Sequence, residues 1–197
     1  SKISTILHFD PWEYRVAVWL HNLDRVSEYG ESIKKQGGSF ISQSFLTKSP
    51  FSHEARSRIV TAVMEHPKKD DEPSDSTLLT ALRIADKLDR LGLLGILSAA
   101  AFRGGVLPLY DAHTPYGYTD TRESKVRSVY NDFFRVLEWV GMLPSDEARG
   151  LISREHLSAY IAFLRGLGKE LSDRLCIENG VEDDIKKALG QYYDQYA

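Results

Sequence analysis

The sequence has little cysteine, no long apolar run and no block of like charge. Its one cysteine, Cys176, cannot form an internal disulfide, which excludes the disulfide frameworks of small secreted domains and favours a reducing, cytoplasmic compartment. No apolar stretch approaches the roughly 18 residues that cross a bilayer, and the N-terminus lacks a signal-peptide pattern, so we expect no membrane partner. Lys and Arg are scattered and the formal net charge is −3, so we expect no nucleic-acid partner.

Several catalytic signatures are missing as well. The chain contains no GxSxG, P-loop or GxGxxG motif, no Cys/His nucleophile pattern and no pair of ligands at HExxH or CxxC spacing. The sequence therefore assigns no nucleophile or general base. Any metal site would have to be assembled from separate segments of the chain.

Helix signals, by contrast, recur along the chain, whereas the alternation typical of strands is hard to find. Asp10 and Pro11 form a helix start, and the apolar residues that follow recur at helical spacing, so Trp12, Trp19 and also Trp139 are expected in the core. The chain has 197 residues and is 42% hydrophobic, which is enough for one sizeable core. We predict an all-α fold, a single domain over residues 1–197 with about seven or eight helices. These helices are expected near residues 11–26, 52–66, 77–91, 95–102, 120–140, 153–175 and 182–196.

The stretches between these helices carry three expectations. Residues 27–51 have weak periodicity, and a connection of this length is often a binding loop or a lid. Gly92 is predicted to be the C-cap of the helix at 77–91. Asp120 and Glu123 are predicted to form a capping box at the start of the helix that runs to residue 140.

The helix at residues 77–91 carries two acidic residues where apolar ones are expected. Asp86 and Asp89 should point toward the buried arc of this helix or border it. A buried carboxylate is costly unless it is paired or binds a cation, and a salt bridge to a neighbouring helix is the more common of the two. The solvent face of the helix is predicted to hold Thr80, Arg83, Lys87 and Arg90.

Two histidines are also predicted to face inward. His66 lies on the inner face of the helix at 52–66, and His21 lies on an apolar side of the first helix. A single histidine in such a place is more often a hydrogen-bonded core residue than a ligand. Together with Asp86, however, they place His or Asp on the inner faces of three separate helices, which would suit a metal held by nitrogen and oxygen ligands.

The order of these residues resembles the HD phosphohydrolase superfamily. Residues 8–111 carry the resemblance, within a bacterial subgroup of small stand-alone HD hydrolases, and the helices within 120–197 match only loosely and should pack on that core. The matching segments are residues 16–23 (VAVWLHNL, against AALLHDI), 59–66 (IVTAVMEH, against I..AI..H) and 85–92 (ADKLDRLG, against ADRLDALG).

The resemblance implies an activity, a cofactor and a set of site residues. In the family a divalent metal, such as Mn, Co, Mg, Fe or Zn, activates water for attack on a phosphoester, often of a nucleotide. A small-molecule phosphoester or nucleotide would then be the partner of this chain. Carried over by position, His21, Asn22 and Asp86 would surround the metal. His66 would be an additional ligand or would contact the phosphate.

The chain departs from the family pattern at the His-Asp pair itself. Asn22 stands where the family has aspartate, and an amide oxygen can coordinate a metal only without charge, which weakens a site. Asp24 would lie about 200° further round a helix, so it is not expected to replace Asn22.

Two further positions differ. The first histidine of the family would fall before Ser1, since His8 is too close to the His21 segment to take its place. Ser98 stands where the subgroup has arginine, and Arg103 is the nearby candidate for contact with the substrate.

Three interpretations stay open. The chain is an active metal-dependent phosphohydrolase, or a degenerate HD domain that binds a ligand or a protein without hydrolysis and without metal, or a plain helical interaction domain. The order of the matched residues disfavours the third. A homodimer also stays open, because the C-terminal tyrosines could pack on the domain or on a second subunit; they are Tyr192, Tyr193 and Tyr196.

Overall fold

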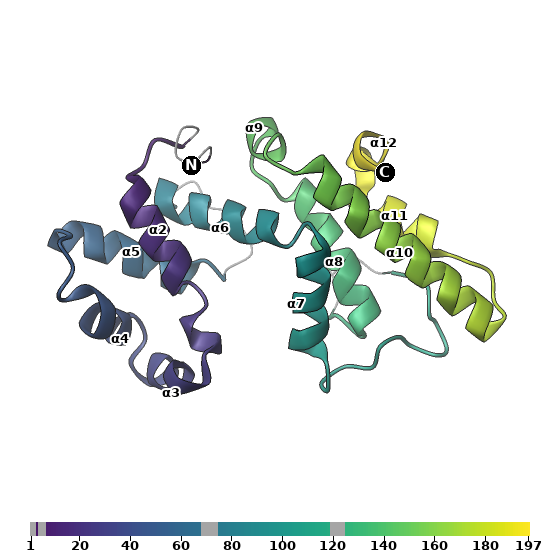
Figure 1. Ribbon diagram of the computed structural model, residues 1–197, viewed down its shortest axis with the longest axis horizontal. Coiled ribbons are helices and arrows are strands. Elements are labelled where there is room, and N and C mark those ends of the chain that lie inside the picture. Colours follow the sequence, from purple (N-terminus) through teal and green to yellow (C-terminus); the bar gives the residue numbers. More distant parts are fainter. Residues whose placement is uncertain (1–2, 4–6, 68–74, 119–124) are drawn as a thin grey trace. The chain divides into compact units, whose positions relative to one another are not determined.

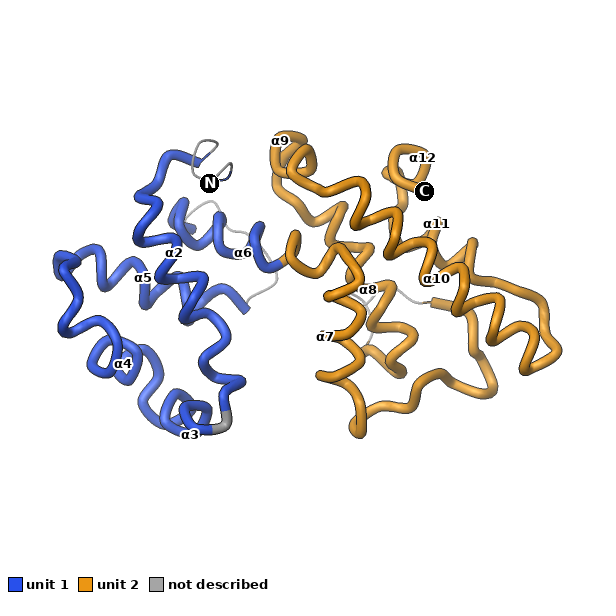
Figure 2. The backbone as a smooth tube through the Cα atoms, viewed as in Figure 1, with its two compact units in different colours: residues 1–86 blue, residues 87–197 orange. Residues whose placement is uncertain are grey.

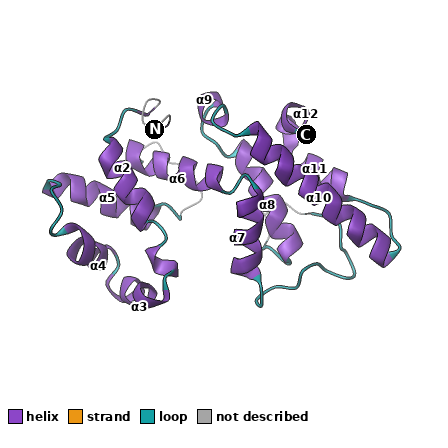
Figure 3. Cartoon of the chain, in the orientation of Figure 1, coloured by secondary structure: helices purple, strands orange, loops and turns teal. Residues whose placement is uncertain are grey.

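The computed structural model describes residues 3, 7–67, 75–118 and 125–197 of the chain. Helices connected by loops make up this part, and no strand occurs in it (Figure 3), which confirms the all-α prediction. None of its helices is both long and apolar enough to span a bilayer. Contacts divide the chain into two units, residues 1–86 and residues 87–197 (Figure 2). The single domain over residues 1–197 stays a prediction.

The first unit is built around the helices α2 (Pro11–Leu20) and α5 (His53–Glu65), which pack on each other (Figure 1). Both begin where the sequence predicts. The Asp10 carboxylate accepts a hydrogen bond from the Trp12 amide at 2.7 Å, and the Ser52 hydroxyl accepts one from the Ala55 amide at 3.2 Å. The core they share with α6 (Thr77–Asp89) is aliphatic and includes Ala17, Leu20, Ile59, Ala62, Val63, Leu78, Leu79 and Leu82.

The two tryptophans of α2 are not in this core. Trp12 is 64% exposed and Trp19 is 85% exposed, so the prediction that they are core residues is wrong. The buried side of α2 carries Glu13, because its carboxylate forms a salt bridge at 2.5 Å with Arg58 of α5. An ion pair between distant residues thus helps to determine which side of α2 is buried, and apolar periodicity does not reveal such a pair.

The stretch from residue 27 to residue 51 is more regular than predicted. It contains α3 (Ser27–Gln36), α4 (Gly38–Ile41) and a π-helix (Ser42–Leu46). Gly37 joins α3 to α4 with φ 57°, a left-handed conformation that favours glycine. The irregular connection expected here is therefore wrong, and its role as a lid stays a prediction.

Helix α6 differs from the prediction in which side chains it buries. Arg83, expected in solvent, is 3% exposed, donates to the Asp75 carboxylate at 2.5 Å and donates to the Glu65 carbonyl oxygen at 3.2 Å. Lys87, also expected in solvent, is buried, and its Nζ donates to the Met142 carbonyl oxygen at 3.2 Å. Asp89, expected to face inward, is exposed. The hydrogen-bond partners of the two cationic heads thus bury a side of α6 that was predicted to face solvent.

The second unit consists of helices around an aromatic and aliphatic core. Tyr130, Phe134, Tyr160 and Leu164 are each at most 1% exposed. Ser153 caps the longest of these helices as predicted, since its hydroxyl accepts from the His156 amide at 3.2 Å. The helices are α7 (Leu93–Arg103), α8 (Val129–Gly141), α9 (Asp146–Arg149), α10 (Arg154–Leu175), α11 (Val181–Leu189) and α12 (Tyr193–Tyr196).

Some boundaries in this unit were predicted wrongly. Gly92 has an extended conformation, φ −171°, and is the N-cap of α7 rather than the C-cap of α6. Helix α8 begins at Val129 behind a Ser128 cap, and the residues of the expected capping box, 120 and 123, lie outside the described part. The last predicted helix is interrupted at Gly190, which has φ 53°.

The C-terminal tyrosines contact side chains of their own unit. The Arg149 guanidinium lies 5.0 Å from the Tyr192 ring centroid, the Tyr193 hydroxyl donates to Glu182 at 2.5 Å, and the Arg154 guanidinium lies 6.0 Å from the Tyr196 ring centroid. These rings therefore have partners within one chain, and the homodimer stays a prediction.

Candidate functional site

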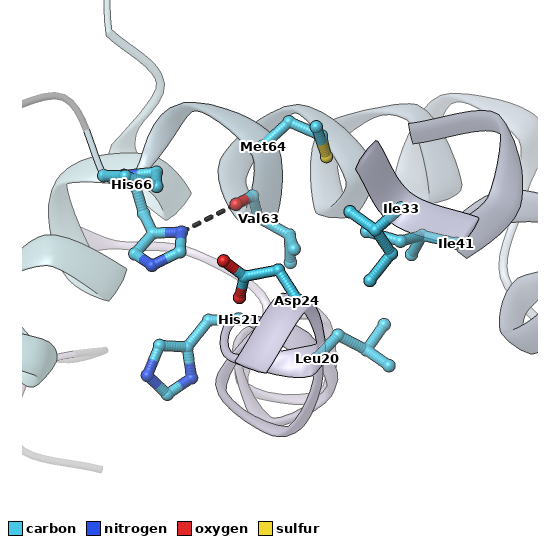
Figure 4. Close-up of a pocket in the computed structure, with 9 residues that line it drawn as sticks. Leu20, His21, Asp24, Ile33, Ile41, Val63, Met64 and His66 are labelled. Carbon is cyan, nitrogen blue, oxygen red and sulfur yellow. Dashed lines mark hydrogen bonds between the residues drawn. The ribbon is translucent and has the colours of Figure 1, made fainter. Parts of the chain in front are cut away.

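Two helices of the first unit end in a histidine. His21 is the C-cap of α2, and His66 is the C-cap of α5. Nδ1 of His21 lies 2.6 Å from the Val18 carbonyl oxygen. Nδ1 of His66 likewise lies 2.6 Å from the Val63 carbonyl oxygen, again three residues earlier (Figure 4). Carbonyls at a helix C-terminus lack intrahelical partners, so they accept the Nδ1–H. This bond fixes the neutral tautomer and leaves a lone pair on each Nε2.

The two imidazoles lie close together and line a small pocket. Their ring centroids are 5.3 Å apart, and the rings meet edge to face at 78°. The C-terminal ends of α2 and α5 carry partial negative charge, which favours a cation at this place. The pocket has a volume of about 90 Å³ and is otherwise mostly apolar; its lining is Leu20, His21, Asp24, Ile33, Ile41, Val63, Met64, His66 and Pro67.

Asp24 belongs to this pocket, contrary to the sequence argument. Figure 4 shows its carboxylate directed toward His21 and His66. Helix α2 ends at Leu20, and a 3-10 helix (Leu23–Arg25) follows, so the angle expected on a continuous helix does not apply. Sequence reasoning missed Asp24 because the apolar pattern continues to Val26, past the actual end of the helix.

Asp86 is brought to His21, as the sequence predicts. One carboxylate oxygen of Asp86 lies 3.8 Å from Nε2 of His21, and the two side chains are 24% and 18% exposed. The nearby Asp86 carboxylate favours the protonated imidazole and so raises the pKa of His21, and burial opposes this only in part. For His66 burial has the larger effect and lowers the pKa, although Asp86 and Asp24 both favour the protonated form.

The Asn22 amide is hydrogen-bonded to Nε2 of His21, the ring nitrogen that a metal would bind. Its Nδ2 lies 2.7 Å from Nε2 of His21, which accepts the amide proton because Nδ1 carries the ring proton. The Oδ1 of Asn22 is buried and has no hydrogen-bond partner among the described residues. A turn of the amide would release Nε2 and direct Oδ1 to the same place.

The donor types at this site fit a divalent metal, although not in their present arrangement. Imidazole nitrogens together with carboxylate and amide oxygens are suitable ligands for ions such as Zn²⁺, Mn²⁺ and Co²⁺. Within the described ranges, no group of three His, Cys, Asp or Glu side chains is placed to hold one ion. Binding would therefore require Asn22 to turn and the side chains of His21 and Asp86 to move closer.

Arg103, expected to contact the substrate, belongs to the second unit. Its Nε donates to the Asp132 carboxylate at 3.2 Å, and a second nitrogen lies 3.5 Å from the other oxygen. Ser98, at the position of the family's arginine, is exposed on α7. The contact of Arg103 with a substrate stays a prediction.

Comparisons with models of protein families, with curated proteins and with solved structures found no match to this chain. The likeness to the HD superfamily therefore depends on the three segments that carry His21, His66 and Asp86.

The opposed pKa shifts of the two histidines predict how pH acts on stability. Burial places the pKa of folded His66 below that of the unfolded chain, so the unfolded chain binds more protons as the pH falls through about 6.5. His66 should therefore stabilise the fold fully above that pH and less below it. We expect the free energy of unfolding of the wild type, relative to His66→Gln, to fall between pH 8 and pH 5.

The measurement is urea unfolding at both pH values. His21, whose raised pKa acts in the opposite direction, is present in both proteins and largely cancels in the difference. His156→Gln, at an exposed histidine of α10, is the matched control and should follow the wild type. A difference between wild type and His66→Gln that stays constant with pH would show that burial does not control this imidazole.

Proposed function

We propose that this chain is a metal-dependent phosphohydrolase of the HD type that acts on a nucleotide or a related phosphoester. The observation that carries the proposal is the meeting of His21, His66 and Asp86, which come from three helices far apart in the sequence. Both imidazoles donate Nδ1–H to a backbone carbonyl, the second interaction that metal-binding histidines usually make.

The residues that would hold the metal follow from the resemblance to the HD superfamily. His21 would contribute Nε2, Asp86 its carboxylate and Asn22 its Oδ1, while His66 would be a further ligand or would contact the phosphate. A bound divalent ion would lower the pKa of a water ligand and neutralise charge on phosphoryl oxygens. Asp24, directed toward both imidazoles, adds negative charge that favours the cation.

The contact between Asn22 and His21 favours a second candidate, a domain that binds a ligand without hydrolysis. The amide at 2.7 Å from Nε2 competes with any metal for that lone pair. It also supplies no negative charge where the family has a carboxylate. In this second function His21 and His66 would contact a ligand without a metal, although the pocket itself, at about 90 Å³, is smaller than a usual small-molecule site.

Metal content separates the two candidates. The protein is incubated with Mn²⁺, Co²⁺ or Zn²⁺, freed of unbound ion and measured by elemental analysis, alongside His21→Ala and Asp86→Ala. The hydrolase proposal expects about one ion per chain in the wild type and a loss of more than tenfold in metal affinity in both variants, because each removes a direct ligand. Hydrolysis of p-nitrophenyl phosphate and nucleotides should then depend on the same two residues.

Two variants control for unspecific effects. Asp89→Ala removes an exposed carboxylate from the helix that carries Asp86, and His156→Ala removes an exposed imidazole. Both should keep the metal. A wild-type protein that holds no ion after incubation contradicts the hydrolase proposal and favours the second candidate, a domain that binds a ligand without hydrolysis.

A further inference from the structure

A second hollow lies in the first unit, between the wall formed by α4 with the start of the π-helix and the wall formed by α5. Its volume is about 300 Å³, at the lower end of the range for small-molecule sites. It shares no lining residue with the histidine pocket. Most of its lining side chains are polar: Ser39, Ser42, His53, Arg56, Ser57 and Thr61.

The two walls are held close together. His53, Ser57 and Thr61 are spaced four residues apart on α5 and so share one face of that helix. On the opposite wall, a Cβ added to Gly38 would lie 2.5 Å from Val60 Cγ1, so only glycine permits this approach of α4 to α5. Ser42 begins the π-helix, a form of backbone that is frequent at functional sites.

Among the described residues that line the hollow, Arg56 carries a positive charge and none is acidic. Arg56 is anchored, because Nε donates to the Phe51 carbonyl oxygen at 2.9 Å and one terminal nitrogen donates to the Ser49 carbonyl oxygen at 2.8 Å. This leaves the other terminal nitrogen for a ligand. Residues 31–56 contain four basic residues, Lys34, Lys35, Lys48 and Arg56, and two acidic ones, Glu31 and Glu54; Glu31 pairs with Lys34 at 3.0 Å. In a chain of net charge −3, this positive balance is local.

We propose that this hollow binds a phosphate group, either free or on a small phosphorylated molecule. Four hydroxyls and an imidazole can donate to phosphoryl oxygens, and an anchored guanidinium gives a charge-assisted hydrogen bond without further loss of side-chain freedom. A neutral ligand would not use the cationic excess. The site is independent of the proposed hydrolase function, because no residue is common to both.

The test is a titration of the full chain with inorganic phosphate and, separately, with glycerol 3-phosphate at constant ionic strength, followed by backbone amide NMR. We expect saturable shifts at residues 38–42 and 53–61. Tighter binding of glycerol 3-phosphate identifies a phosphorylated molecule as the ligand, and tighter binding of inorganic phosphate identifies the free anion. Ser57→Asp should weaken binding of both probes by about tenfold or more, because it places a carboxylate beside the anion.

Ser158→Asp is the matched control. Ser57 and Ser158 are both exposed, and each is the fifth residue of its helix, so the change affects helix stability similarly. The control should bind phosphate as the wild type does. If Ser57→Asp loses helical circular dichroism, Thr61→Glu, one turn further along α5 and also exposed, replaces it.

Three results would overturn the proposal. They are an absence of saturable shifts up to tens of millimolar phosphate, shifts centred on His21 and His66 instead, and unchanged affinity in the variant that introduces the carboxylate. Because the histidine pocket shares no residue with this hollow, loss of metal binding there would not affect the outcome.

Discussion

Asn22→Asp is expected to tighten divalent-metal binding by about tenfold or more, because a carboxylate next to a dication is worth far more than an amide. In the wild type the Asn22 amide donates to Nε2 of His21 at 2.7 Å and occupies its lone pair. A carboxylate cannot donate this hydrogen bond, so Nε2 becomes available to the metal. Asp86, 3.8 Å from the same nitrogen, would then complete a donor set of two carboxylates and one imidazole.

The measurement is isothermal titration with Mn²⁺ and Zn²⁺ at pH 7.5, with all variants at the same pH because protons compete with the metal for the imidazole. Asn179→Asp is the control, since Oδ1 of the exposed Asn179 accepts from the Val181 amide at 3.1 Å and an aspartate oxygen can do the same. Phosphatase activity that appears only with Asn22→Asp would identify the wild type as a degenerate HD domain. Equal affinity in wild type and Asn22→Asp would show that the metal, if any, binds elsewhere.

Asp184→Ala is expected to destabilise the second unit by about 3 kcal/mol or more, because it leaves several donors without an acceptor. Asp184 is 1% exposed and accepts from the Tyr130 hydroxyl at 2.7 Å, the Tyr118 amide at 3.0 Å and the Gly117 amide at 3.3 Å. Burial raises the pKa of this carboxyl, although the hydrogen bonds favour its charged form. The carboxylate thus ties the 117–118 loop to α8 and α11.

Urea unfolding followed by circular dichroism measures this effect. Asp183→Ala, at the exposed neighbour, should change the free energy of unfolding by less than about 0.5 kcal/mol. Asp184→Asn retains one acceptor and should fall between the two. A cost below about 1 kcal/mol for Asp184→Ala would mean that water replaces the carboxylate, contrary to the burial of this site.

The sequence predicted much of the local structure correctly. The caps Asp10, Ser52 and Ser153 start helices where expected, because a cap is a contact between residues two or three positions apart. The inward placement of His66 followed from the 3.6-residue period in the same way. The all-α fold class follows from the sum of such short-range signals.

The orientation of several helices was not predictable by these means. Arg83 faces inward because it donates hydrogen bonds to the Asp75 carboxylate and the Glu65 carbonyl oxygen. Glu13 faces inward because its carboxylate forms a salt bridge with Arg58. The apolar period gives no sign of an ion pair or hydrogen bond between distant residues. It therefore predicted an exposed Arg83. It also placed Trp12 and Trp19 in the core, whereas the side of α2 that packs on the core carries Glu13, Ala17 and Leu20.

For the candidate site, the sequence by itself determined which residues could serve, and the tertiary structure decided which of them meet. His21, Asn22, His66 and Asp86 were identified from residue type, inward face and family order. Only the fold brought His21 within 3.8 Å of Asp86 and turned the chain after Leu20 so that Asp24 enters the pocket. Donor chemistry belongs to the side chain, whereas proximity between distant segments depends on where helices end and how they pack, which short-range patterns do not encode.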